Sequence, residues 1–365
     1  MISFWWAQIK SVIPLEMKKT LFARRGLWIY IVALLPLLLF MAQFLMASRL
    51  RVRNSHIAAQ SEKQLSEQDL HAVRPGMTSE EVIALLGKPP ERFRWNERRR
   101  LDSSEFETVR HEEYQYSDGF KSLFIRFDDG KAASVNLQGY TLADDSVVFA
   151  GVFQFFYLRL AIFFGCLGIF MNLFRGEILD KTLHFYFLAP IRRDVLMVGK
   201  FLAGLLATCA IFVTSELLQI IVFTGQFSSS ARELYFYQHH GLAQTAAYLG
   251  VTALACLGYG AFFLAAGMLF RNPILPAAAI LVWEAVNPFL PALLKKFSVI
   301  YYLKSLCPVD IPTPPGTPPL LALLVSNPDP VSAPVAILGI VFVSLLVLYV
   351  SSFRVRRMEI NYTTE

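Results

Sequence analysis

The sequence predicts an α-helical polytopic membrane protein of about six spans, with a small α+β soluble domain inserted between the first and second spans. Three observations lead to this fold class. The chain of 365 residues is 55% hydrophobic and only 17% charged. Its apolar residues gather in runs of about 20 residues or more, the length that a helix needs to cross a bilayer. After the first run, a stretch of roughly a hundred residues is rich in charge yet keeps apolar residues at regular spacing, as a folded soluble domain does.

The predicted spans are the six apolar runs. They cover residues 27–47, 147–174, 201–223, 245–270, 274–294 and 335–353. The first run is longer than the apolar region of a cleavable signal peptide, so we expect it to remain as a span. The fifth run contains Pro276, Pro288 and Pro291. Because proline breaks or kinks a helix, this run is expected to be one irregular span, two shorter helices or a re-entrant element.

The distribution of lysine and arginine predicts the orientation. These residues concentrate in 1–26, 175–200 and 354–365, whereas the short loops on the other side hold few of them. Positive charge marks the cytoplasmic side. Arg49, Arg51 and Arg53 argue the other way, but they open a long loop, and long loops translocate largely regardless of charge. We therefore predict an integral protein of the cytoplasmic (inner) membrane, with both termini and the 354–365 tail in the cytoplasm and residues 48–146 outside.

Residues 1–26 are predicted to be a cytoplasmic interfacial segment. Phe4, Trp5 and Trp6 are followed by Lys18 and Lys19, and aromatic residues with basic ones suit a helix lying in the membrane interface. A plain basic flank of the first span would explain the same residues. The net charge of +6 fits a basic inner face, and nothing else in the sequence points to nucleic acid.

Residues 175–200, RGEILDKTLHFYFLAPIRRDVLMVGK, form a charged segment between the second and third spans. Leu183 and Phe187 recur at helical spacing, and Pro190 is expected to end that helix. Such an amphipathic helix in a cytoplasmic loop can dock onto lipid headgroups or onto a soluble partner.

This segment resembles the coupling segment of the permeases of type-2 ABC exporters. The matching positions are Glu177, Lys181, Thr182, Leu183, Leu188, Ala189, Pro190, Ile191, Arg192, Arg193, Gly199 and Lys200. The resemblance implies that the segment docks onto an ABC ATPase subunit and that two permease chains, identical or not, form the pathway. The residues expected to couple to the ATPase are Glu177, Lys181, Leu183, Phe187, Pro190, Arg192, Arg193 and Lys200. An ordinary basic interfacial loop remains the alternative.

The chain itself has no Walker A motif, so ATP and Mg²⁺ are expected on the partner ATPase and this chain is not expected to be an enzyme. It also lacks an H-E-x-x-H or G-x-S-x-G motif. Cys166, Cys209 and Cys256 fall within predicted spans and Cys307 in an outer loop, a distribution that excludes a disulfide framework and a CxxC metal site. The outer loop 307–334 is rich in proline and is expected to be extended.

The inserted domain has clear local signals. Residues 48–62 are interpreted as a polar stalk. Thr78 or Ser79 can cap a helix whose apolar side holds Val82 and Leu86, and Gly87 can end it. Residues 123–127 and 132–137 are predicted strands joined by an Asp129-Gly130 turn. The run 98–100 is predicted to be a solvated loop.

The domain resembles the SmpA/OmlA/BamE small-lipoprotein family over residues 64–138. The resemblance rests on Pro75-Gly76-Met77-Thr78, Glu81-Val82, Leu86-Gly87-Lys88-Pro89, Tyr114, Tyr116 and 127–131. It implies helices packed on a short antiparallel sheet and a role in binding partners.

Three charged residues lie within predicted spans: Arg159, Glu216 and Glu284. Charges in hydrocarbon are unfavourable and usually face a bundle interior, a partner or a pathway. Arg159 can pair with either glutamate to fix the packing, or the three can line a substrate path.

These observations predict the transmembrane permease subunit of an ATP-driven ABC transporter of exporter type. The alternative is a non-transporting membrane scaffold whose outer domain recruits cell-envelope assembly partners. A secondary transporter is a third possibility, but the two halves of the chain show no convincing inverted repeat.

Overall fold

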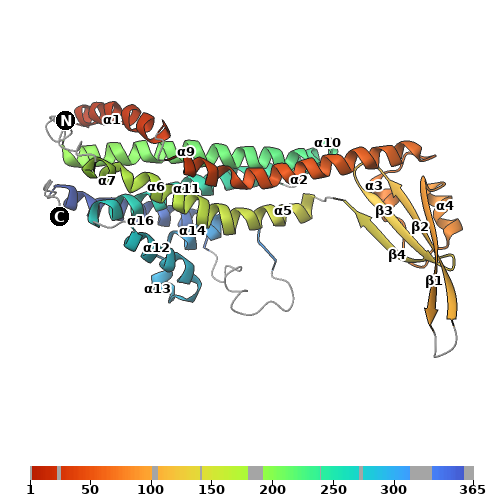
Figure 1. Ribbon diagram of the computed structural model, residues 1–365. Helices are drawn as coiled ribbons and strands as arrows, with labels where there is room; N and C mark the ends of the chain where they lie inside the picture. Colours follow the sequence, from red (N-terminus) through yellow and green to blue (C-terminus); the bar gives the residue numbers. More distant parts are fainter. Residues whose placement is uncertain are drawn as a thin grey trace. The chain divides into compact units, whose positions relative to one another are not determined.

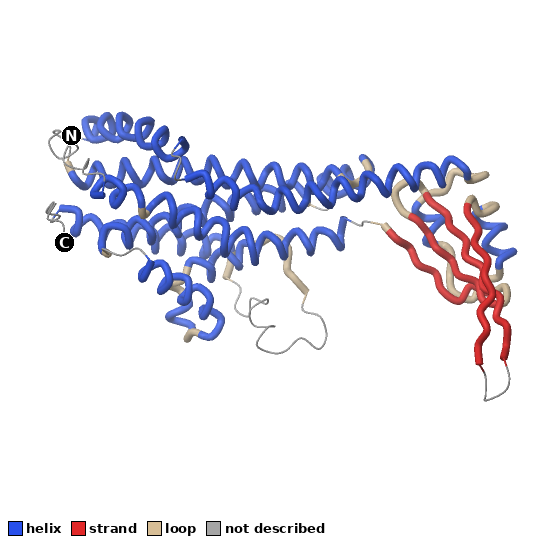
Figure 2. Tube along the Cα trace, viewed as in Figure 1, coloured by secondary structure: helices blue, strands red, loops and turns tan. Residues whose placement is uncertain are grey.

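The computed structural model describes residues 2–22, 26–100, 106–139, 142–179, 192–238, 240–270, 274–312 and 331–356. The chain forms two compact units, which are described separately (Figures 1 and 2). The helical unit comprises Met1–Leu39, Ser146–Ile221 and Phe236–Glu365. The sheet unit comprises Phe40–Asp145 and Val222–Tyr235.

Five helical stretches within the described residues are long and apolar enough to cross a membrane. They are α2 (Leu27–Gln60), the stretch Asp145–Glu177, α9 (Arg193–Gly225), α11 (Gly241–Leu269) and α16 (Ala333–Arg356). The second of them is built from α5 (Leu142–Gly151), the π-helix η2 (Val152–Ile162), α6 (Phe163–Phe170) and α7 (Asn172–Leu179). Helices of this length and composition are those of an α-helical membrane protein, as the sequence predicts.

The fifth predicted span is not one helix. The 274–294 run forms α12 (Ile274–Val286), the 3₁₀-helix η4 (Asn287–Phe289) and α13 (Ala292–Lys295), and α14 (Val299–Leu306) follows. Pro288 lies at the start of η4, and Pro291 precedes α13. Each proline lacks the N–H that would continue the preceding helix, so the run forms shorter helices, one of the alternatives that its prolines indicate.

Close packing in the helical unit depends on small residues opposite aromatic rings. A Cβ atom on Gly260 of α11 would lie 2.5 Å from the ring of Phe170 on α6. On the same helices, Phe163 makes edge contacts with Tyr259 and Phe263, with ring centroids 5.4 and 4.9 Å apart. Because the glycine lets the ring approach the backbone, α6 and α11 are held at one fixed spacing.

The sheet unit is an α+β fold. Two short helices, α3 (Glu67–His71) and α4 (Ser79–Leu86), precede the strands β1 (Glu91–Arg100), β2 (Phe106–Ser117), β3 (Ser122–Asp128) and β4 (Lys131–Gln138). The strands form an antiparallel sheet in the order β1-β2-β3-β4.

The predicted polar stalk is helical as far as Gln60, since residues 48–60 continue α2. This extension contacts the sheet: the Ser122 hydroxyl donates to Asn54 Oδ1 at 2.8 Å, and Asn54 Nδ2 donates to the Phe120 carbonyl at 3.2 Å. The 98–100 run is not a loop, because its backbone pairs with β2 as the end of β1.

The predicted caps of α4 are confirmed. Thr78 accepts a hydrogen bond from the Glu81 N–H through its side chain, and the Glu81 carboxylate accepts one from the Thr78 N–H at 2.8 Å. This reciprocal capping box satisfies two N–H groups that the helix itself cannot. Gly87 ends the helix at φ +82°, a backbone conformation that strongly favours glycine.

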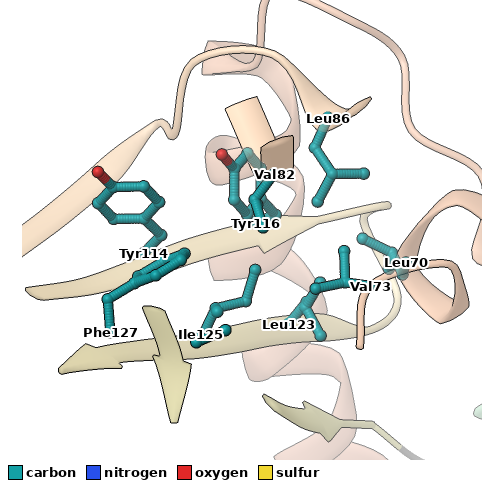
Figure 3. Packing of buried hydrophobic residues seen from close by; sticks show 10 residues of the cluster. Leu70, Val73, Val82, Leu86, Tyr114, Tyr116, Leu123, Ile125 and Phe127 are labelled. Atoms are coloured by element: carbon teal, nitrogen blue, oxygen red, sulfur yellow. The ribbon is translucent and has the colours of Figure 1, made fainter. Parts of the chain in front are cut away.

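The apolar core of the sheet unit lies between the helices and one face of the sheet (Figure 3). Tyr116 on β2 lies beside Val82 of α4, and Tyr114 packs against Phe127 of β3 with ring centroids 4.6 Å apart. The Tyr116 hydroxyl also donates to the Gly87 carbonyl at 2.9 Å. Alternate residues of a strand point to the same face of the sheet. The apolar residues at every second position therefore form the inner face.

The Asp129-Gly130 turn is also confirmed. Both residues have positive φ, and Asp128 pairs with Lys131 across the two-residue loop. Gly76 and Met77 exchange backbone hydrogen bonds with Ala132, each of 2.8 Å. The Gly76-Met77-Thr78 motif therefore has a structural role within the sheet unit. Its first two residues pair with the start of β4, and Thr78 then begins α4.

Candidate functional site

The helical unit contains a group of four charged residues, three of them buried, which we name the Lys200 cluster. Its members are Glu16, Lys19, Glu177 and Lys200. Glu16 and Lys19 come from α1 (Ile2–Phe22), Glu177 from α7 and Lys200 from α9. The helix α1, which is far from the other two in the sequence, therefore meets α7 and α9 at one ionic centre.

Lys200 is the centre of the cluster. Its side chain has no exposed surface, and its Nζ lies 2.9 Å from Glu16 Oε1 and 2.8 Å from Glu177 Oε1. Nζ also donates to the Leu173 carbonyl of α7 at 3.2 Å. A lysine ammonium has three N–H donors, and these three oxygen atoms match that number. A buried charge is tolerated only with such compensation.

Lys19 closes the cluster on its exposed side. Its Nζ lies 3.1 Å from Glu177 Oε1 and 3.9 Å from Glu16 Oε1, while half of its side chain remains exposed. The cluster thus contains two carboxylates and two ammonium groups. Their formal charges cancel, which lowers the free-energy cost of burying Lys200.

Gly199 explains why α1 comes close enough for these contacts. A Cβ atom at this position would lie 3.2 Å from Val12 Cγ1, which is tighter than ordinary van der Waals contact. Val12 is buried, and it lies one helical turn before Glu16 on the same side of α1. In the Gly199-Lys200 pair, the small glycine therefore allows α1 to pack closely against α9, and the lysine charge holds α1 there.

A second, more exposed ionic group joins the start of α9 to the end of α16. Asp194 Oδ2 lies 3.1 Å from Arg192 Nη2 and 3.1 Å from Arg356 Nη2. Arg193 Nη1 donates to the Arg356 carbonyl at 3.2 Å. The Arg192 guanidinium also lies over the Trp5 ring of α1, 4.9 Å from its centroid. The starts of α1 and α9 and the end of α16 are thus connected.

The structure describes only some of the residues that are predicted to couple to the ATPase. Glu177 and Lys200 contact each other directly, and Arg192 and Arg193 belong to the Asp194 group. The other predicted residues, Lys181, Leu183, Phe187 and Pro190, lie outside the described residues. The last residues of the predicted segment are helical, because α9 begins at Arg193 and Lys200 lies two turns inside it.

Of the three charges predicted within spans, Glu284 has a clear structural environment. Its carboxylate accepts hydrogen bonds from the Ser298 hydroxyl at 3.0 Å and from the N–H groups of Val299 and Ile300 at 3.0 and 2.8 Å. It therefore caps the first turn of α14, where free N–H groups and the helix dipole favour a negative charge.

Arg159 and Glu216 lie elsewhere in the helical unit. The Arg159 guanidinium lies over the Phe155 ring, 5.3 Å from its centroid. Glu216 of α9 has no exposed surface. Arg159 and Glu284 interact electrostatically, so a structural role for this pair in helix packing stays a prediction.

Sequence reasoning missed Glu16, Lys19, Asp194 and Arg356 as partners of the coupling residues. One signal for Glu16 was available, because it is the single acidic residue among the first 26. Its partner could not be identified, since Lys200 lies 184 positions away.

Comparisons with protein families, with curated protein sequences and with solved structures find no match for this chain.

Proposed function

We propose that this chain is the transmembrane permease subunit of an ATP-driven ABC transporter of exporter type. The observation that carries the proposal is the contact between Lys200 and Glu177. Residue 177 lies near the end of α7 and residue 200 near the start of α9, so the pair joins the two helices that flank the predicted ATPase-docking segment. A force on that segment would reach both helices together.

In this proposal the ATPase subunit docks on the cytoplasmic segment between α7 and α9. ATP and Mg²⁺ bind to that partner, and closure of the ATPase dimer displaces the segment. The Lys200 cluster passes the displacement to α1, α7 and α9 as one body. ATP can favour one of the two permease conformations only if its binding affinity differs between them. A rigid contact between the docking segment and the spans provides this difference, because it links the conformation of the permease to that of the ATPase.

The remaining parts fit this assignment. A second permease chain completes the pathway, both termini are cytoplasmic and the sheet unit is outside, where it binds a partner as the lipoprotein domains that it resembles do. The helical extension of α2 contacts β3 through Asn54 and Ser122.

The test is affinity purification of the full chain from its native host in mild detergent, followed by identification of any Walker A protein that comes with it. We expect an ATPase to co-purify with the wild type. The Arg192→Glu, Arg193→Glu double variant should lose it, because the partner's charges would be left unpaired, which can weaken binding by about 2–5 kcal/mol. Lys200→Met should retain the ATPase but uncouple its ATP hydrolysis from the permease.

Arg356→Glu is the matched control. It breaks the same contact with Asp194 from outside the docking segment. If Arg356→Glu loses the ATPase as fully as the double variant, the loss comes from a disturbed fold rather than from docking. If no ATPase accompanies the wild type, the transporter proposal fails and the scaffold function, with partners bound to the sheet unit, becomes the better one.

A further inference from the structure

Glu216 and Glu284 are both buried in the helical unit, but their carboxylates have opposite surroundings. Glu216 lies on α9 and Glu284 on α12. Their exposed fractions are 0% and 9%. Because the residue type and the burial are matched, any difference in their behaviour must come from the groups around them.

The Glu284 carboxylate is surrounded by hydrogen-bond donors. One hydroxyl and two backbone N–H groups at the start of α14 donate to its two oxygen atoms, as described above. Three donors and a helix N-terminus stabilise the ionised form of a carboxyl group. Glu284 is therefore in a site built for a negative charge.

The Glu216 carboxyl has no such donors. Neither of its oxygen atoms has a hydrogen-bond partner among the residues that the structure describes. Tyr157 of η2 interacts electrostatically with Glu216, but its hydroxyl donates to the Phe212 carbonyl at 2.5 Å. The neighbouring Ser215 hydroxyl donates to the Ala33 carbonyl of α2 at 2.6 Å. Both hydroxyls thus donate to backbone oxygens and not to the Glu216 carboxyl.

Among the residues that the structure describes, no positive charge compensates for the missing donors. The titratable groups that act electrostatically with Glu216 are the phenol of Tyr157 and the thiol of Cys307, which follows α14. Neither is a cation, and no charged residue among those described acts on Glu216. An isolated carboxylate in such a place would be strongly destabilised, so the group is held as a neutral acid instead.

We propose that Glu216 is a proton-binding site inside the helical unit. It carries a proton while the helices are packed as in the structure, and it releases that proton when a conformational change admits water to the carboxyl. The packed conformation therefore binds one proton more than the hydrated conformation does. By linkage, protonation of Glu216 shifts the equilibrium toward the packed conformation. This inference does not depend on the proposed transport function.

A lipid-soluble carbodiimide tests the proposal on the full chain in proteoliposomes. The carboxylic acid transfers its proton to a carbodiimide nitrogen while its oxygen attacks the central carbon. The acyl group then migrates to nitrogen and leaves a stable acylurea. Only a protonated carboxyl in an apolar place reacts efficiently, so the adduct marks such groups, and mass spectrometry of peptides locates it.

We expect the adduct at Glu216, formed about tenfold faster than at Glu284, a ratio that corresponds to about 1.4 kcal/mol in the free energy of protonation. Labelling should fall as the pH is raised, and Glu216→Gln should abolish it at that position. Absence of label at Glu216, or equal labelling of the two glutamates, would overturn the proposal.

Thermal unfolding gives a second, independent result. Glutamine has the shape of a neutral glutamic acid, so Glu216→Gln should keep the wild-type Tm. Glu284→Gln removes a charge that three donors compensate and should lower the Tm by several degrees. A fall in Tm for Glu216→Gln as large as that for Glu284→Gln would mean that Glu216 is ionised and paired, and the proposal would be wrong.

Discussion

Lys200 and Glu16 form a buried ion pair across 184 positions of the sequence, with 2.9 Å between Nζ and Oε1. The contact joins the N-terminal helix α1 to the span α9. Glu177 shares the same ammonium group at 2.8 Å, so α7 is included. The first helix of the chain is therefore part of the ionic framework of the helical unit, and it is more than a flank of the first span.

Replacing Lys200 by Met should destabilise the helical unit strongly. The variant leaves Glu16 and Glu177 buried without their shared cation, and breaking a buried pair in this way lowers the free energy of unfolding by about 3–5 kcal/mol. Thermal unfolding of the purified protein in detergent measures the loss.

Lys19→Met is the matched control. Lys19 belongs to the same cluster, but half of its side chain is exposed. Exposed ion pairs contribute about 0–1 kcal/mol, so this variant should remain close to the wild type. Equal losses for the two lysine variants would contradict the central role of Lys200. Replacing Glu16 and Glu177 by Gln in the Lys200→Met background should recover part of the stability.

The N-cap of α4 can be tested within the sheet unit, which has its own core. Thr78→Ala removes the side chain that accepts from the Glu81 N–H and should lower the free energy of unfolding by about 1 kcal/mol. Ser79→Ala, at the next position, should change it little, because Ser79 is inside the helix and is not its cap. Urea denaturation of a fragment of residues 48–139 compares the two, and a larger loss for Ser79→Ala would contradict this assignment.

The stability of the sheet unit should fall at acidic pH through Glu112. Burial disfavours its ionised form, but hydrogen bonds from Arg92 and from the Tyr114 hydroxyl outweigh that effect, so the pKa of Glu112 is lowered. A lowered carboxyl pKa contributes stability that is complete above the pKa of the unfolded chain, about 4.3, and is lost as the pH falls through the folded-state value.

Glu112→Gln should therefore flatten the acid side of the pH–stability curve of the same fragment. Urea midpoints measured at several pH values below about 5 would show it, since this is where an ordinary glutamate begins to take up protons. If the variant keeps the full wild-type slope, Glu112 does not supply the pH dependence.

Cysteine accessibility tests the proposed orientation. In a variant without the four native cysteines, a cysteine placed at the exposed position Ser134 of β4 should react with an impermeant reagent in intact cells. A cysteine at Ser11, exposed on α1, should react only after permeabilisation. Labelling of Ser11 from outside would reverse the orientation and place the Lys200 cluster on the wrong side for an ATPase.

The membrane class and the local elements of the sheet unit could be predicted from the amino-acid sequence. Apolar runs of this length have no stable place in water, so composition alone settles the class. The α4 caps and the Asp129-Gly130 turn could be predicted because their hydrogen bonds join residues no more than four positions apart. The break at Pro288 and Pro291 was among the alternatives for the same reason, since proline acts on its own helix.

Which charges are compensated could not be predicted from the sequence, because it depends on contacts between distant parts of the chain. Glu16, Glu177 and Lys200 look like ordinary interfacial charges in the sequence, and so do their neighbours. Glu216 and Glu284 are the same residue type in similar apolar runs, yet one is surrounded by donors from α14 and the other by none among the described residues. The free energy of a buried charge depends on the groups within a few ångströms of it, and folding selects those groups from anywhere in the chain.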